Sequence, residues 1–416
     1  MEERSKNILY FGYGSTAMAV FSVNFVALAA YQYDLNSEKI RVLPLIAYLV
    51  VLLSNLFASV VALLMPMRRL LLGSLFILSA LSLVTGIVLN ELTLWIFYLC
   101  SAIALGLMRV GFLNELVLQN DYERSTITDT CHLEAAYLAG VAVITVLSSI
   151  AITAPFLELK HMYWMISTIF LILGLLTQLR KNAFQFAYCN GTPASLGQIL
   201  LSPLKTIGIL RHSMIILLFS CVFLIGAIIG WMYAWTVDYT SKFLQLSDQL
   251  RWEFNLTQFI CSIIGLMINA ALVHYVRIRY LLIGGLLLNI IAVLFLTSAA
   301  FDYQPQQSID TMAELPVFIL LALLMIFVSS SISPILTGLA IFHTHNEKRN
   351  FLIGLATFGV LGGSMASNFI FHFVTDQFTP AILLGGTILP LCLVLILSVL
   401  FVGDLRKSSF IPTSTA

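Results

Sequence analysis

The stretch Arg68-Arg69-Leu70-Leu71-Leu72-Gly73-Ser74-Leu75 returns later in the chain as Arg279-Tyr280-Leu281-Leu282-Ile283-Gly284-Gly285-Leu286. Arginine, glycine, a small residue and leucine keep the same spacing in both copies. Each copy sits in a short turn that joins the second and third long apolar stretches of its half of the chain. A repeat of this span in so apolar a chain predicts two parallel halves of six helices around a central pathway.

The composition is that of a membrane protein. Of the 416 residues, 60% are hydrophobic and 10% are charged, which is too little charge to cover a soluble protein of this length. We therefore predict an all-α integral membrane protein with twelve transmembrane helices in two six-helix pseudo-symmetric halves. The expected spans are about 8–31, 43–65, 70–90, 93–118, 132–153, 162–179, 213–238, 251–275, 280–300, 315–341, 351–374 and 379–402.

The longest polar connection predicts how the chain is divided. It contains the turn signals Asn190-Gly191-Thr192-Pro193 and Ser202-Pro203. We expect an N-terminal half, a cytoplasmic linker, a C-terminal half and a cytoplasmic tail, at residues 1–179, 180–212, 213–402 and 403–416.

The basic residues predict the orientation. If the N-terminus is inside, the inner segments hold fifteen lysines and arginines, the outer loops hold five, and Arg109 lies within a helix. This bias predicts both termini in the cytoplasm, in a plasma membrane or a bacterial inner membrane. The first apolar stretch is too long for a cleaved signal peptide, and Tyr31-Gln32-Tyr33-Asp34 follows it where a cleavage site would lie.

Several classes of protein find no support in the sequence. A net charge of +1 gives no reason to expect nucleic acid. No nucleophile–base constellation is visible, so we expect no enzyme and no cofactor. We expect a small-molecule substrate and the lipid bilayer as partners, and a monomer. The six cysteines lack metal-type pair spacing, so we also expect no metal and no disulfide framework; they are Cys100, Cys131, Cys189, Cys221, Cys261 and Cys392.

Polar residues form stripes at helical spacing on two predicted spans. The eighth span has Asn255, Gln258, Ser262, Gly265 and Asn269 on one face, and the eleventh has Thr357, Ser364, Asn368 and His372. Gly359 and Gly363 have the small-xxx-small spacing of a close helix approach. Such stripes either line a pathway or bond neighbouring helices together, and with a serine run before Pro334 they favour a water-accessible pathway in the second half.

Charges inside the predicted membrane region are costly and need a partner or a role. Arg109 lies deepest, toward the cytoplasmic third of the fourth span, with Glu115 near the inner end of that span. Glu134 opens the fifth span from the same side. Arg109 is expected to pair with Glu134 or Glu115 as an inner clasp or gate, or to contact substrate. No acidic residue falls at the expected midplane, which favours facilitated diffusion over proton coupling.

The two six-span halves, the long central loop and the two arginine turns resemble the major facilitator superfamily. The resemblance covers the whole chain at the level of topology and implies two halves that rock about a central site. The superfamily's signature loop usually carries Gly, Asp and several Arg. Here it reads Leu64-Met65-Pro66-Met67-Arg68-Arg69, without the Asp and the leading Gly.

Shorter segments are similar to equilibrative nucleoside transporters: Asn24-Phe25 with Tyr31-Gln32-Tyr33, the run 67–75, and Phe254-Asn255-Leu256-Thr257-Gln258-Phe259. In that family a first-span Asn contacts the nucleoside, which falls on Asn24, and a fourth-span contact falls on Asn114. The family's eighth-span Asp and Arg look like Gln258 and Ser262. The resemblance thus implies a substrate site at these four positions, and helical phasing adds Asn368.

These observations predict a transporter that moves a small polar solute by alternating access. The solute that the resemblance favours is a nucleoside or a related metabolite, moved down its own gradient. One alternative is a proton-coupled major facilitator symporter for a sugar or another small metabolite. A second alternative, of another class, is a membrane receptor or scaffold that transports nothing.

Overall fold

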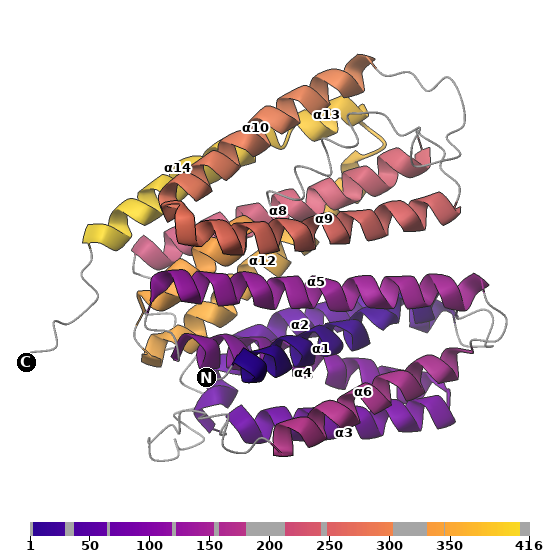
Figure 1. Cartoon of the computed structure of the whole chain (residues 1–416). Coiled ribbons are helices and arrows are strands. Elements are labelled where there is room, and N and C mark those ends of the chain that lie inside the picture. The colour runs from indigo at the N-terminus through magenta and orange to yellow at the C-terminus, as the bar shows by residue number, and fades with distance from the viewer. Residues whose placement is uncertain are drawn as a thin grey trace, which may run out of the picture. The chain divides into compact units, whose positions relative to one another are not determined.

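The computed structural model of the chain describes residues 3–29, 37–64, 67–118, 122–153, 158–179, 213–242, 248–302, 331–344 and 346–407. The regular elements in these ranges are helices (Figure 1). Nine of the helical segments found there are long and apolar enough to cross a membrane, and Val42–Ala58 and Ser331–Phe342 are shorter apolar helices. The labelled helices are α1 (Glu3–Ala29), α2 (Ser37–Leu64), α3 (Met67–Ile87), α4 (Glu91–Leu118), α5 (Glu123–Thr153), α6 (Leu159–Leu179), α8 (Ser213–Lys242), α9 (Asp248–Tyr275), α10 (Ile278–Asp302), α12 (Asn346–Val374), α13 (Pro380–Gly385) and α14 (Ile388–Lys407).

The helices form two compact units. Unit 1 comprises Met1–Asp121 and Ala136–Thr206, and unit 2 comprises Tyr122–Ala135 and Ile207–Ala416. The helix α5 thus contributes its first turns to unit 2 and the remainder to unit 1. The predicted bounds of the halves stay a prediction, and the predicted linker at 180–212 lies outside the described residues.

The first turns of α5 bond to other helices of unit 2. Arg124 donates to the backbone carbonyl of His274 at 2.7 Å, and the Thr128 hydroxyl lies 3.1 Å from the His274 ring. The Glu123 carboxylate lies 3.3 Å from the imidazole of His343. These polar contacts join this end of α5 to α9 and to His343, which directly follows the helical segment Ser331–Phe342.

Within unit 1, α3 lies along α6 and α2 lies along α4 (Figure 1). The Ser79 and Ser167 hydroxyls each donate across the α3–α6 contact to the other's backbone carbonyl, at 3.0 and 2.8 Å. Between α1 and α5, a Cβ added at Gly140 would lie 1.9 Å from the carbonyl oxygen of Gly14. The absence of side chains at these two glycines therefore lets the two backbones touch.

Within unit 2, α8 packs along α12, and α10 packs along α13 and α14 (Figure 1). A Cβ added at Gly363 would lie 2.0 Å from the carbonyl oxygen of Phe223, and one at Gly359 would lie 2.8 Å from the Val222 side chain. The close helix approach predicted from the spacing of these two glycines is confirmed. A Cβ at Gly226 would likewise meet the Val360 carbonyl oxygen at 2.0 Å.

The arginine repeat occupies matching positions in the two units. Arg68 is the second residue of α3, and Arg279 is the second residue of α10. A Cβ at either Gly73 or Gly284 would meet nothing within 4 Å, so both glycines face open space. The repeated glycine is therefore not a packing contact in either unit. The side chain of Arg68 lies outside the described residues.

The fifth helix begins earlier than the sequence predicted. It starts at Glu123 rather than near residue 132, so Glu134 lies within the helix, about 16 Å along its axis from Glu123 at 1.5 Å per residue. The added turns contain threonines whose hydroxyls donate to carbonyls four residues earlier, as Thr128 does to Arg124 and Thr130 does to Thr126. A search for apolar runs misses such turns because their side chains are polar.

The twelfth predicted span, 379–402, is interrupted. Its first turns form α13, which is capped by the Thr379 hydroxyl and begins at Pro380, and α14 begins at Ile388. Pro390 has no N–H to donate to the carbonyl of Gly386, so the helical ladder breaks there. Trp231 and Trp235 on α8 fix the short helix by donating to the carbonyls of Leu383 and Pro380, at 2.8 and 2.9 Å.

Candidate functional site

Unit 1 contains a cluster of aromatic rings from three helices. Phe21 on α1 lies 5.3 Å from Tyr48 on α2 and 5.6 Å from Tyr137 on α5, measured between ring centroids. Tyr13, which lies eight residues before Phe21 on α1, about two turns away, stacks on Tyr137 at 5.6 Å. The exposed amide of Asn24 donates to the Tyr48 hydroxyl at 2.6 Å. We call Phe21, Asn24, Tyr48 and Tyr137 the ring cluster.

A buried cation is connected to this cluster through Tyr13. Arg109 on α4 is 9% exposed and donates to the Tyr13 hydroxyl at 3.0 Å. Through Tyr13 the guanidinium is connected to the ring of Tyr137. Such a cation is costly in an apolar setting, so its position within α4 marks it as structural or functional rather than incidental.

The predicted partners of Arg109 stay a prediction. The side chains of Glu115 and Asn114 lie outside the described residues, although both positions are within α4. Glu134 is half-buried on the part of α5 that belongs to unit 2. The sequence predicted this carboxylate at the start of the fifth span. It lies instead within α5, which begins eleven residues earlier, at Glu123.

A second polar network in unit 1 is fully enclosed. The Tyr98 hydroxyl lies 2.9 Å from the Ser22 hydroxyl and 2.7 Å from the Tyr163 hydroxyl. Ser82 donates to the backbone carbonyl of Tyr163 at 2.7 Å. All four residues are buried, and the chain of bonds joins α1, α4, α6 and α3. Because no member is open to a solute, we read this network as a connection between helices.

Unit 2 brings two of the predicted site residues together on α9. Gln258 and Ser262 are each 1% exposed. The Gln258 amide donates to the Thr236 hydroxyl at 2.9 Å, and the Ser262 hydroxyl lies 3.3 Å from that of Tyr233. These two residues of the predicted stripe therefore face α8. These bonds match the helix-bonding interpretation of the stripe, and the pathway interpretation stays a prediction.

The remaining predicted positions are distributed over other helices. Asn368 is half-buried on α12, one turn beyond Ser364, which a Cβ at Gly230 of α8 would meet at 2.6 Å. Asn24 belongs to unit 1, whereas Gln258, Ser262 and Asn368 belong to unit 2. Sequence reasoning missed the rings around Asn24. A signal was available, since Tyr13, Phe21 and Asn24 recur near helical spacing on one stretch.

Comparisons with known proteins identify the fold. No protein-family model matches the sequence, and no curated protein sequence matches it. Among solved structures, the chain is similar to the Escherichia coli fucose:proton symporter FucP, with 14% identity, a TM-score of 0.71, and 96% of this chain and 98% of that chain covered.

Two further structures match over nearly their whole length. A bacterial homologue of the iron transporter ferroportin is 13% identical with a TM-score of 0.69, over 96% of this chain and 99% of that one. The human organic anion transporter MFSD10 is 14% identical with a TM-score of 0.71, over 95% of this chain and 99% of that one. All three are named as transporters.

The chain therefore has the fold of the major facilitator superfamily, as the arginine repeat predicted, and it is a multi-pass integral membrane protein. The similarity to equilibrative nucleoside transporters finds no counterpart among these structures.

Proposed function

We propose that this chain is a membrane transporter that moves a small polar solute by alternating access. The fold supports the proposal, because the similar structures are named as transporters of chemically different solutes. The ring cluster supports it further. A protein that served only as a scaffold would have no need of an exposed amide bonded to a tyrosine within a cluster of rings from three helices.

The ring cluster favours a solute that contains a flat ring, because such a ring can stack on aromatic side chains. Phe21, Tyr48 and Tyr137 offer aromatic faces and edges for stacking. The exposed Asn24 amide can both donate to and accept from a base edge or a hydroxyl. A nucleoside combines both properties, with a stacking base and a hydroxylated ribose. We therefore keep a nucleoside or a related metabolite as the proposed substrate.

Uptake into proteoliposomes tests this substrate class. Labelled nucleosides, hexoses and amino acids would be offered in turn, and we expect nucleosides to be taken up fastest. Replacing Asn24 with Ala should lower kcat/KM about 2- to 10-fold, the value of one neutral hydrogen bond. Ser298→Ala, at an exposed position on α10, is the matched control. Equal uptake by both variants would remove Asn24 from the site.

We propose that unit 2 contributes to the same function through Gln258, Ser262 and Asn368, with Asn114 added from α4. Gln258 is bonded to Thr236, so its replacement acts on the arrangement of α8 and α9 as well as on any direct contact. We expect Gln258→Ala to weaken uptake more than Ser298→Ala does. Unchanged uptake by the Gln258→Ala protein would mean that Gln258 is not part of the substrate site.

We propose that the solute gradient alone drives net flux. The bound solute then shifts the equilibrium between the inward-open and outward-open conformers only as far as its affinities for the two conformers differ. One observation favours the proton-coupled alternative: Glu134 lies well within α5, and carboxylates inside spanning helices are often part of proton pathways. Uptake with and without an imposed pH gradient separates the two. Concentrative uptake that a protonophore abolishes, and that Glu134→Gln also abolishes, would establish coupling and overturn the facilitative proposal.

We further propose that both termini are cytoplasmic, in a plasma or bacterial inner membrane, and that the transporter acts as a monomer. The excess of basic residues in the inner segments supports the orientation. Protease protection of a tag at either end tests it: in sealed right-side-out vesicles both tags should resist cleavage. Cleavage of one tag alone would contradict an even number of spans.

A further inference from the structure

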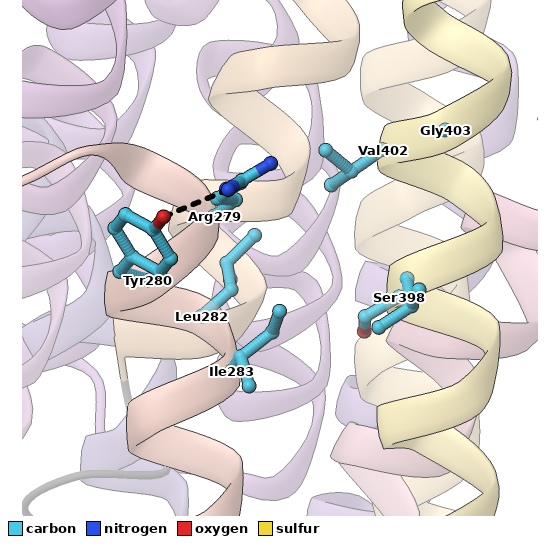
Figure 2. A pocket seen from close by; sticks show the side chains of 8 residues that line it. Arg279, Tyr280, Leu282, Ile283, Ser398, Val402 and Gly403 are labelled. Carbon is cyan, nitrogen blue, oxygen red and sulfur yellow. Dashed lines mark hydrogen bonds between the residues drawn. The ribbon is translucent and has the colours of Figure 1, made fainter.

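A groove in unit 2 lies between the beginning of α10 and the end of α14 (Figure 2). Its volume is about 340 Å³. Figure 2 shows that Arg279, Leu282 and Ile283 extend from α10 towards α14. The lining residues are Arg279, Tyr280, Leu282, Ile283, Ser398, Val399, Val402 and Gly403. The groove thus combines one cation at the end of the helix pair with an apolar wall.

The charge of Arg279 is not balanced by an acid in the lining of the groove. The guanidinium donates to the Tyr280 hydroxyl at 2.7 Å and lies 4.6 Å from the centre of that ring. Neither contact neutralises the positive charge of the guanidinium, and both hold it against Tyr280 at the edge of the groove. Donors in a planar fork with an adjacent phenol suit the oxygens of a phosphate.

The apolar part of the groove continues onto a surface that the membrane would cover. Along α10, Leu287, Ile291 and Phe295 are 45%, 49% and 64% exposed. On α14, Val399 and Ile396 are 49% and 58% exposed. An acyl chain that entered the groove could therefore run along this exposed face without leaving lipid. A free anion would gain nothing from these apolar side chains.

We propose that this groove binds one anionic phospholipid at the membrane surface near the start of α10. Its phosphate is bound by Arg279 and Tyr280, and an acyl chain packs against Ile283, Val399 and Val402. The last turn of α14 holds two basic residues, Arg406 and Lys407, and one acidic residue, Asp404, so its net positive charge favours an anionic headgroup. The inference rests on the membrane-spanning fold and not on the proposed substrate.

The test uses the purified full chain in mixed micelles. Phosphatidylglycerol, phosphatidylcholine of the same acyl composition, and inorganic phosphate are titrated separately. Bound lipid is counted by native mass spectrometry, and the thermal midpoint is recorded. We expect phosphatidylglycerol to bind and raise the midpoint, and phosphatidylcholine to bind more weakly. Equal effects of the two lipids, or stabilisation by inorganic phosphate alone, would overturn the proposal.

Two variants and one control locate the site. Arg279→Gln should raise the Kd for phosphatidylglycerol about fivefold, which corresponds to about 1 kcal/mol for one basic residue at a membrane surface. Arg277→Gln removes an exposed charge two residues earlier, outside the groove lining, and should change the Kd clearly less. Equal effects of the two substitutions would mean unspecific attraction to the surface and would contradict a groove.

Gly403→Phe fills the groove instead of removing charge. A Cβ at Gly403 would meet nothing within 4 Å, so a larger side chain has room to enter the space. We expect weaker phosphatidylglycerol binding with an unchanged midpoint in the absence of lipid. Full lipid binding by a monodisperse Gly403→Phe protein would place the lipid elsewhere. If this variant does not fold, the comparison of Arg279→Gln with Arg277→Gln still decides.

Discussion

The contact between α8 and α12 gives the sharpest prediction, the effect of Gly363→Ala. A Cβ at this position would lie 2.0 Å from the carbonyl oxygen of Phe223 and 2.9 Å from the backbone nitrogen of Ala227. Both obstacles are backbone atoms, so no side-chain rotation relieves the overlap. The two helices must separate instead, and every other contact along them weakens as they do.

The cost is that of an overpacked core, at the upper end of its usual range, about 3 kcal/mol. At an unfolding entropy of about 2.1 cal/mol/K per residue, a chain of 416 residues shifts its midpoint by about 1 °C per kcal/mol, so the thermal midpoint should fall by about 3 °C. The matched control is Gly284→Ala on α10, where an added Cβ meets nothing within 4 Å. There the substitution should be neutral or stabilising, by up to about 1 kcal/mol, because alanine favours the helix.

The assay is thermal unfolding of the detergent-solubilised full chain, followed by the loss of the monodisperse peak on size-exclusion chromatography. Wild type and both variants are heated in parallel. A midpoint for Gly363→Ala that is no lower than that of Gly284→Ala would refute the reasoning, because it would mean that the helices are not in backbone contact at this position.

Three further substitutions test other parts of the structure in the same assay. Tyr98→Phe removes the hydrogen bonds to Ser22 and Tyr163 and should lower the free energy of unfolding by about 1–3 kcal/mol. Tyr275, whose side chain is 87% exposed, is the control, and Tyr275→Phe should leave the midpoint unchanged. Equal midpoints for the two variants would argue against the enclosed network. Asn289→Leu replaces a fully buried amide for which the described residues supply no hydrogen-bond partner, so it should leave the midpoint unchanged or raise it, and a clear fall would contradict this. Trp235→Phe removes the bond to the Pro380 carbonyl and should cost about 1 kcal/mol, which a midpoint equal to that of wild type would exclude.

The fold could be predicted from the sequence because its causes are local. Long apolar runs and the two copies of the arginine turn can each be found within a short segment, and together they predicted the observed fold. The helix contact at Gly359 and Gly363 was predictable for the same reason, since the spacing of small residues on one helix determines how closely another can approach.

The ends of helices were less predictable where polar residues continue a helix or a proline interrupts it. The early start of α5 depends on threonines bonding to their own backbone, which hydropathy does not register. The break between α13 and α14 occurs inside one apolar run. In both cases the hydrogen bonds of the backbone, rather than the apolarity of the side chains, decide where the helix ends.

The candidate site was the least predictable part. Gln258 and Ser262 were found because they share a face of one helix. The ring cluster was missed because Phe21, Tyr48 and Tyr137 come from three helices. The spacing of Tyr13, Phe21 and Asn24 marks one face of the first helix, but it does not show which side chains of other helices meet that face. A single sequence gives little information about contacts between distant segments, and a solute site in a helical bundle consists of such contacts.

The open glycines of the arginine repeat offer a use beyond the fold itself. Gly73 and Gly284 hold matching places on α3 and α10, and neither has an atom near its missing side chain. A cysteine at each position could carry a spin label or a fluorophore with little disturbance of packing. The labelled pair would act as a molecular ruler between the two units, and the distribution of label distances with and without solute would record how many states a transport cycle visits.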